Sequence, residues 1–138
     1  YAASVVLDMG LSRRIITCKE GIYYLAKIGH YLLHDTMTRV NMDFTHDVCY
    51  QGLFFLADSL NEGKPSGLKV FGDWSTIYPA LSQLPDPARE SWFAFDHYYS
   101  DGPLNAALPY VFANNPTTLY DVGGNTGKWA LRCCKYNE

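Results

Sequence analysis

The sequence predicts a mainly α-helical protein that changes to a strand-turn-helix pattern near its C-terminal end. Its 138 residues are 48% hydrophobic and 18% charged, which is enough apolar material to bury a core. Helical spacing and helix-capping residues recur between residues 27 and 112. An Asn-Asn-Pro sequence at 114–116 then separates these helices from an extended, glycine-rich stretch.

A β-hairpin is predicted close to the N-terminus. β-branched and aromatic residues run over 15–18 and again over 22–25, and Lys19-Glu20-Gly21 lies between them. A glycine between two such runs is typical of a hairpin, because glycine readily adopts the left-handed backbone that tight turns need.

Helices are expected on both sides of this hairpin. Residues 4–9 are compatible with a short helix that stops at Gly10, and residues 27–33 have a second helical pattern. A helix, a hairpin and a helix in this order are the outline of the second half of a winged helix-turn-helix. We therefore expect a partial, winged-helix-like region over residues 1–36.

The middle of the chain, residues 37–113, is predicted to be a helical region. Leucines at three- and four-residue spacing indicate one helix, Asp73 and Asp86-Pro87 have the residue types that begin helices, and Asp-Gly-Pro indicates a break before the last helix. The expected helices are 47–60, 73–83, one from Asp86 through Phe95, and 104–112.

The residues that most strongly suggest chemistry are the motif Asp-Val-Gly-Gly-Asn-Thr-Gly at 121–127. A strand candidate at 117–122 runs into it and a helix over 128–136 follows, so the motif is the turn of half a βαβ unit. Open α/β sheets bind ligands at such turns, at the carboxyl edge of the sheet.

The spacing of the motif narrows the kind of ligand. Asn125 replaces the second glycine of the dinucleotide fingerprint G-x-G-x-x-G, and the G-x-x-x-x-G-K phosphate loop is absent. The acid at position 121 instead suits a cationic ligand, such as a methionyl amine beside a sulfonium. An ordinary turn capped by Asp121 is the alternative.

The motif resembles motif I of the S-adenosylmethionine-dependent methyltransferases, usually acid-hydrophobic-Gly-Gly-Gly-x-Gly. The aromatic stretch at 93–101 and the helix expected after it are similar to the region before motif I in small-molecule O-methyltransferases, typified by the plant phenolic and hydroxyindole enzymes. Those enzymes also have an N-terminal winged-helix dimerisation domain, which matches the hairpin around 19–21. The three features occur in the same order and together cover nearly the whole chain.

The resemblance implies a homodimer, in which 37–113 is a dimerisation and linker region and 114–138 begins a Rossmann-like domain that binds S-adenosylmethionine. Phe93 and His97 fall roughly where the family places residues against the methyl acceptor, although the loop length differs. Asparagine departs from the family's glycine at 125 but tolerates left-handed backbone. The implied cofactor-binding residues are Asp121, Gly123, Gly124, Asn125 and Gly127.

The resemblance also implies methyl transfer to a hydroxyl of a small molecule, in a reaction that this chain does not complete. The family's ribose-binding acid, expected about 20 residues beyond the turn, and its catalytic histidine would both fall past Glu138. We therefore expect a portion of a longer enzyme, with no catalytic residue and no metal ligand of its own.

Charge and cysteine usage bear on the partners and the compartment. A net charge of −3 and a pI near 5.7 argue against nucleic-acid binding, although a winged-helix transcriptional regulator is the alternative function. No apolar run approaches the roughly 18 residues of a membrane span. The four cysteines lack the spacing of a disulfide framework, so a cytoplasmic location is expected.

Histidines and aromatic residues offer weaker candidates. His30 and His34 are four residues apart, as zinc ligands can be, but surface or packing roles are favoured because no glutamate or cysteine has the matching spacing. His46-Asp47 and Asp96-His97 are not expected to pair, because sequence neighbours on a helix do not face each other. The aromatic residues at 92–99 suit either packing or the wall of an acceptor pocket.

Overall fold

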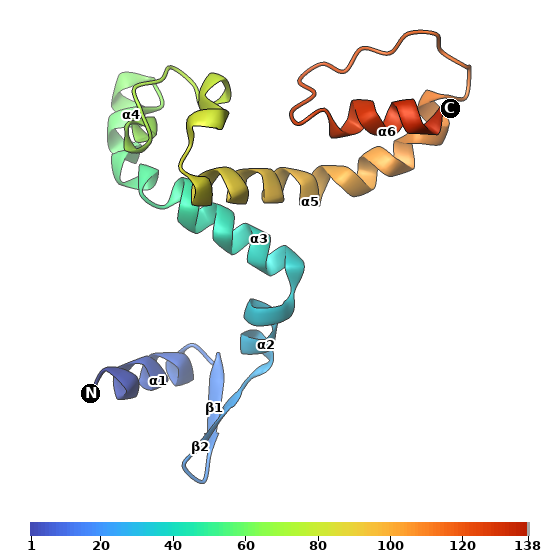
Figure 1. Ribbon diagram of the computed structural model, residues 1–138. Helices are drawn as coiled ribbons and strands as arrows, with labels where there is room; N and C mark the ends of the chain where they lie inside the picture. The colour runs from blue at the N-terminus through green and yellow to red at the C-terminus, as the bar shows by residue number, and fades with distance from the viewer. Residues whose placement is uncertain (138) are drawn as a thin grey trace. The chain divides into compact units, whose positions relative to one another are not determined.

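A computed structural model, which describes residues 1–137, has a mainly helical chain with one two-stranded sheet in its described part (Figure 1). The mainly α-helical class predicted above is therefore confirmed. The chain divides into two compact units, Tyr1–Trp92 and a second unit that begins at Phe93. None of the helices in the described chain is both long and apolar enough to cross a membrane.

The first unit contains short elements of several kinds. In chain order they are α1 (Ala2–Ser12), β1 (Ile16–Lys19), β2 (Ile22–Leu25), α2 (Lys27–His34), α3 (Thr36–Phe44), the π-helical η1 (Thr45–Cys49), the 3₁₀ turn η2 (Gly52–Phe55), α4 (Leu56–Glu62) and the 3₁₀ turns η3 (Ser66–Val70) and η4 (Tyr78–Gln83). The long helix α5 (Asp86–Val111) starts in this unit, and α6 (Lys128–Tyr136) lies in the second.

The hairpin has the predicted position and turn. β1 and β2 are antiparallel, with Ile16 opposite Leu25. Glu20 and Gly21 form the connection with φ values of 51° and 78°. Two successive residues with positive φ are characteristic of the type I′ turn, whose twist matches that of paired strands.

Helix α2 packs closely on the hairpin because residue 29 has no side chain. Gly29 is buried, and a Cβ atom built on it would lie 2.5 Å from the Ile15 carbonyl oxygen and 2.6 Å from Cδ2 of Leu25. Any larger residue would push the helix away from the chain that leads into β1.

Two helices differ from the sequence prediction in extent or regularity. Helix α1 continues through Gly10 to Ser12, since one glycine weakens a helix by only about 1 kcal/mol. The predicted helix over 47–60 is instead divided among η1, η2 and α4. Its apolar stripe predicted helical backbone correctly but did not predict the changes in helical pitch.

The region around the two predicted helix starts also differs. No α-helix begins at Asp73. The only helical segment between Asp73 and Gln83 is the 3₁₀ segment η4, which ends at Gln83. The predicted break at 100–103 is wrong, because α5 is continuous through Pro103. Arg132 donates hydrogen bonds to the backbone oxygen of Asp101 and to Oδ1 of Asn105, and thereby holds together the two sides of this proline.

The strand predicted at 117–122 is absent, since no sheet in the described chain includes these residues. A strand is stabilised by pairing its N–H and C=O groups with a neighbouring strand. The only described sheet is the hairpin, which lies in the first unit. Residues 117–122 therefore have the side-chain pattern of a β-strand, but no neighbouring strand pairs with them in the described chain.

The core of the first unit lies where η4 leads into α5. Ala80, Leu84 and Ala88 are almost fully buried there. The Trp92 ring lies 5.6 Å from that of Phe44 and 6.4 Å from that of Tyr78, measured between centroids. Aromatic contacts at these distances add to the stabilisation from buried area.

The close approach at Gly29 gives a test of the N-terminal packing. We expect Gly29→Ala to destabilise the protein by about 1–3 kcal/mol, because the new methyl group must displace backbone as well as Leu25. Chemical denaturation followed by circular dichroism measures the change. Leu60→Ala is the control, because the Leu60 side chain in α4 is 76% exposed and its truncation should change the stability by no more than about 0.5 kcal/mol.

Candidate functional site

The motif at 121–127 forms a tight loop that runs directly into α6. Gly123, Asn125 and Gly127 have φ values of 76°, 47° and 73°. The Gly127 amide donates to the carbonyl oxygen of Gly124 at 2.7 Å and closes the turn. Asn125 is thus in the left-handed region expected of it, and the predicted helix after the turn is confirmed.

The Asp121 carboxylate lies against the backbone of Gly124. A Cβ atom on Gly124 would be 2.6 Å from Oδ2 of Asp121, so a side chain at position 124 would displace the carboxylate. Asp121 is exposed, and no hydrogen bond or ion pair joins its carboxylate to another described residue. The loop therefore presents an uncompensated negative charge beside exposed glycine backbone.

Cys133 on α6 is close enough to Asp121 to be affected by its negative charge. It is the only buried residue among the described residues of the second unit, and burial raises the pKa of its thiol, with the negative charge of Asp121 adding to the effect. The thiol is therefore protonated at neutral pH and packs as an apolar group.

Two side-chain hydrogen bonds hold the loop to α5. Asn125 Nδ2 donates to Oδ2 of Asp96 at 3.0 Å, and Thr126 Oγ1 lies 3.2 Å from Nε2 of His97. Asparagine at 125 therefore contributes a contact that the family's glycine has no side chain to make. The second bond places His97, a sequence-predicted site residue, beside the loop.

Asp101 is the charged centre of this part of the molecule. Its carboxylate accepts from Nζ of Lys128, lies 3.2 Å from NH2 of Arg132 and lies 3.3 Å from Nδ1 of His97. The Lys128 hydrogen bond, together with the Arg132 and Lys128 charges, holds the pKa of Asp101 below its ordinary value. One α5 side chain thus binds two α6 residues and orients the His97 ring.

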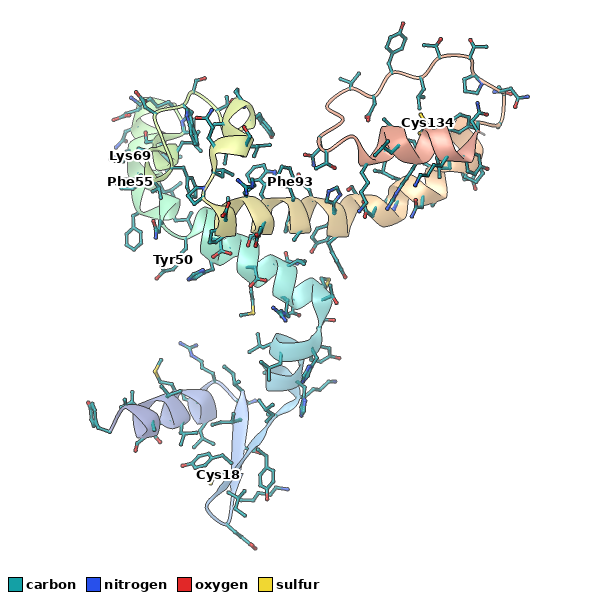
Figure 2. The ribbon with its side chains drawn as sticks, viewed as in Figure 1. Cys18, Tyr50, Phe55, Lys69, Phe93 and Cys134 are labelled. Carbon is teal, nitrogen blue, oxygen red and sulfur yellow. The ribbon has the colours of Figure 1, made fainter. Side chains whose placement is uncertain are left out.

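Phe93 lies one helical turn before His97 on α5 and is half-buried (Figure 2). Residues four apart on a helix share a face. His97 contacts the loop through Thr126, whereas Phe93 has no hydrogen bond or ring contact with the described loop residues. The structure therefore brings His97 and the 121–127 motif together and leaves Phe93 on the adjoining turn.

The pair His46-Asp47 corrects a sequence expectation. His46 Nδ1 lies 2.7 Å from Oδ1 of Asp47, because these neighbours belong to the π-helical segment η1, where successive side chains are closer in angle than on an α-helix. Ser91 donates to the other Asp47 oxygen at 2.5 Å. The hydrogen bond from Ser91 lowers the pKa of Asp47, and the hydrogen bond from His46 lowers it further by a smaller amount.

The carboxylate stands between the hydroxyl and the imidazole in this cluster. Nucleophilic catalysis needs the imidazole next to the hydroxyl, so that it can take the hydroxyl's proton. The Ser91, Asp47 and His46 arrangement is therefore a structural hydrogen-bond network rather than a nucleophile with its base.

Sequence reasoning missed four residues that organise the site: Asp101, Thr126, Lys128 and Arg132. One of them had a detectable signal, because Asp101 follows His97 by four residues on a helix, the spacing at which side chains meet. The contacts of the other three join segments far apart in the chain, and no local pattern encodes them.

Comparison with known proteins identified no protein-family model that matches the chain and no curated protein with significant similarity. The described residues contain no cluster of three or more histidine, cysteine, aspartate or glutamate side chains suited to a metal ion. The groups that this site offers for binding or chemistry are an exposed carboxylate, glycine backbone and an oriented imidazole.

The Asp101 interactions predict a pH-dependent attachment of α6. Because the pKa of Asp101 is depressed, its stabilisation is complete above the ordinary value of 3.8 and is lost as pH falls through the lower value in the folded protein. We expect the NMR amide shifts of α6 to move towards unfolded values over that acidic range. Asp101→Asn should speed amide hydrogen exchange across α6 at neutral pH, measured by mass spectrometry.

Asp43→Asn is the control for this experiment, since Asp43 is an exposed acid of α3 in the first unit. It should leave exchange in α6 unchanged. Equal protection of α6 in the native protein and in Asp101→Asn would contradict the role given to this carboxylate.

Proposed function

We propose that this chain carries the methionine-binding loop of an S-adenosylmethionine-dependent methyltransferase that acts on a hydroxyl of a small molecule. One observation carries the proposal: the exposed Asp121 carboxylate lies against Gly124, in a loop with left-handed backbone at Gly123, Asn125 and Gly127. The same loop bears the sequence similarity to motif I.

The loop suits the methionyl part of the cofactor on electrostatic grounds. The cofactor's ammonium and sulfonium groups are cationic, and Asp121 supplies a negative charge that no described residue neutralises. Glycines at 123 and 124 allow a ligand to approach the backbone, because neither carries a side chain. When bound, the cofactor supplies an electrophilic methyl group.

The residues on α5 suit the methyl acceptor. The Asp101 carboxylate beside Nδ1 of His97 favours the proton on that nitrogen, which leaves Nε2 as a hydrogen-bond acceptor. Nε2 lies beside the hydroxyl of Thr126, and this supports a hydroxyl-bearing acceptor at the same position. Phe93, one turn away, offers an apolar surface for the acceptor's body.

A homodimer and a cytoplasmic location complete the proposal. Ile22, Tyr23, Tyr24 and Leu25 of β2 are 41–57% exposed, an apolar strand surface of the kind that protein interfaces cover. All four cysteines are free, as is usual in a reducing compartment. The alternative, a winged-helix DNA-binding regulator, is less well supported because this strand carries no basic side chain.

Cofactor binding tests the central claim. We expect isothermal titration with S-adenosylmethionine to give one site per chain. Asp121→Asn should weaken it about tenfold or more, because a charge-assisted contact is lost. Gly124→Ala should weaken it as well, since its methyl group displaces the Asp121 carboxylate.

Val122→Ala is the matched control, because Val122 is 95% exposed and no contact is assigned to it. It should bind like the native chain. The absence of heat at millimolar S-adenosylmethionine would refute the proposal, and affinity for mixed-sequence DNA that falls steeply between 50 and 200 mM salt would favour the regulator instead.

Light scattering tests the homodimer. We expect a dimer mass at micromolar concentration, and a monomer for Tyr24→Glu, because a buried unpaired charge is costly at an interface. Lys64→Glu changes charge at an exposed residue outside the hairpin and should remain dimeric. A monomer mass for the native chain would contradict this part of the proposal.

A further inference from the structure

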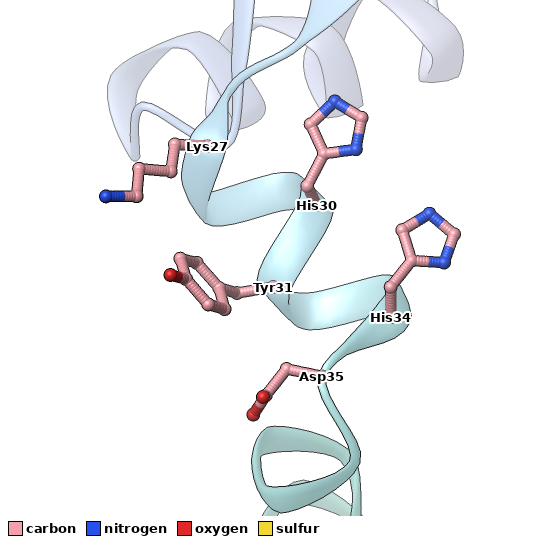
Figure 3. Close-up of a pocket in the computed structure, with 5 residues that line it drawn as sticks. All are labelled: Lys27, His30, Tyr31, His34 and Asp35. Carbon is pink, nitrogen blue, oxygen red and sulfur yellow. The ribbon is translucent and has the colours of Figure 1, made fainter.

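Two histidines of α2 lie one helical turn apart with their rings side by side. The ring centroids of His30 and His34 are 6.0 Å apart, with 28° between the ring planes. Figure 3 shows both rings on the same side of α2, whereas Lys27 and Tyr31 project from the other side. The positive charge of Lys27 is thus directed away from the imidazoles.

The ring nitrogens of both histidines are available to a ligand. Both residues are exposed, and in the part of the chain that the structure describes no hydrogen bond or ion pair engages either ring. His97 and His46, by contrast, each have a carboxylate partner. The nitrogens of both rings therefore have no protein partner among the described residues.

The separation of the rings suits one shared ion. A transition-metal ion about 2.0–2.1 Å from an imidazole nitrogen lies about 3.2 Å from the ring centre, so two ligating rings can be at most about 6.4 Å apart. The observed 6.0 Å is within this limit. Binding one ion would require rotation about the side-chain bonds, because the lone pairs lie in the ring planes and the two rings are stacked.

The surroundings favour a cation. His34 lies in the last turn of α2, where the helix dipole is negative. An open pocket of about 550 Å³ adjoins both rings and leaves room for coordinated water. Asp35 also borders it, but its carboxylate accepts hydrogen bonds from the amide and hydroxyl of Thr38 and begins α3, so it contributes charge rather than a ligand.

We propose that His30 and His34 form a two-imidazole binding site for a divalent transition-metal ion, with water completing the coordination shell. Imidazole ligands suit copper, nickel and zinc, and affinity should follow the general order in which copper binds most tightly. The site lies on α2 in the first unit and is independent of the proposed methyltransferase function.

Titration calorimetry of the full chain with Cu²⁺, Ni²⁺ and Zn²⁺ at about pH 7.5, where imidazole is neutral, tests the proposal. We expect one site per chain, with Cu²⁺ tightest, and a loss of at least tenfold in affinity in both His30→Ala and His34→Ala. His46→Ala is the control for removing a histidine outside the pair and should bind as the native chain does.

A double variant tests the spacing itself. Tyr31→His with His34→Ala keeps the number of imidazoles but places the second next to His30 in sequence, where side chains diverge. It should bind as weakly as His34→Ala alone, while circular dichroism shows an intact fold. Native affinity in His34→Ala, or restored affinity in the double variant, would overturn the proposal.

Discussion

The position of the 121–127 loop depends on the Asp101 carboxylate. Helix α6 has nine residues, which is too short to be stable in isolation, and its only buried residue is Cys133. Apolar burial is therefore a small part of what holds α6, apart from the contact between the Phe112 and Tyr136 rings at 5.4 Å. Polar contacts to Lys128 and Arg132 must supply much of the rest, and both converge on Asp101.

The same carboxylate links the two halves of the proposed site. It faces Nδ1 of His97, whose other nitrogen meets Thr126 in the loop, so the loop and the candidate acceptor residue share one support. Asp96 supplies a second tie through Asn125. Asn125 thus combines the left-handed backbone that a glycine would readily adopt with a side-chain contact that a glycine could not make.

Local signals in the sequence were sufficient where a structure is stabilised locally. The hairpin turn at Glu20-Gly21, the left-handed Asn125 and the start of α6 each depend on a few adjacent residues, and each was predictable. The state of residues 117–122 could not be predicted locally, because a strand forms only when a distant segment pairs with it. The continuity of α5 through Pro103 could not be predicted either, since Arg132, 29 positions further along the chain, stabilises it.

The backbone of the 121–127 loop has a conformation that costs free energy. Of the non-glycine residues with positive φ, Asn125 lies between two positive-φ glycines, and a left-handed non-glycine residue costs on the order of 1 kcal/mol. Burial of apolar side chains in the loop does not offset this free-energy cost, since Val122 and Asn125 are exposed. The carboxylates of Asp47, Asp96 and Asp101 accept hydrogen bonds from other side chains, whereas the Asp121 carboxylate lies against Gly124 and is exposed to solvent. The loop thus combines left-handed backbone with an exposed Asp121 carboxylate, and the proposed binding of a cationic ligand rests on this combination.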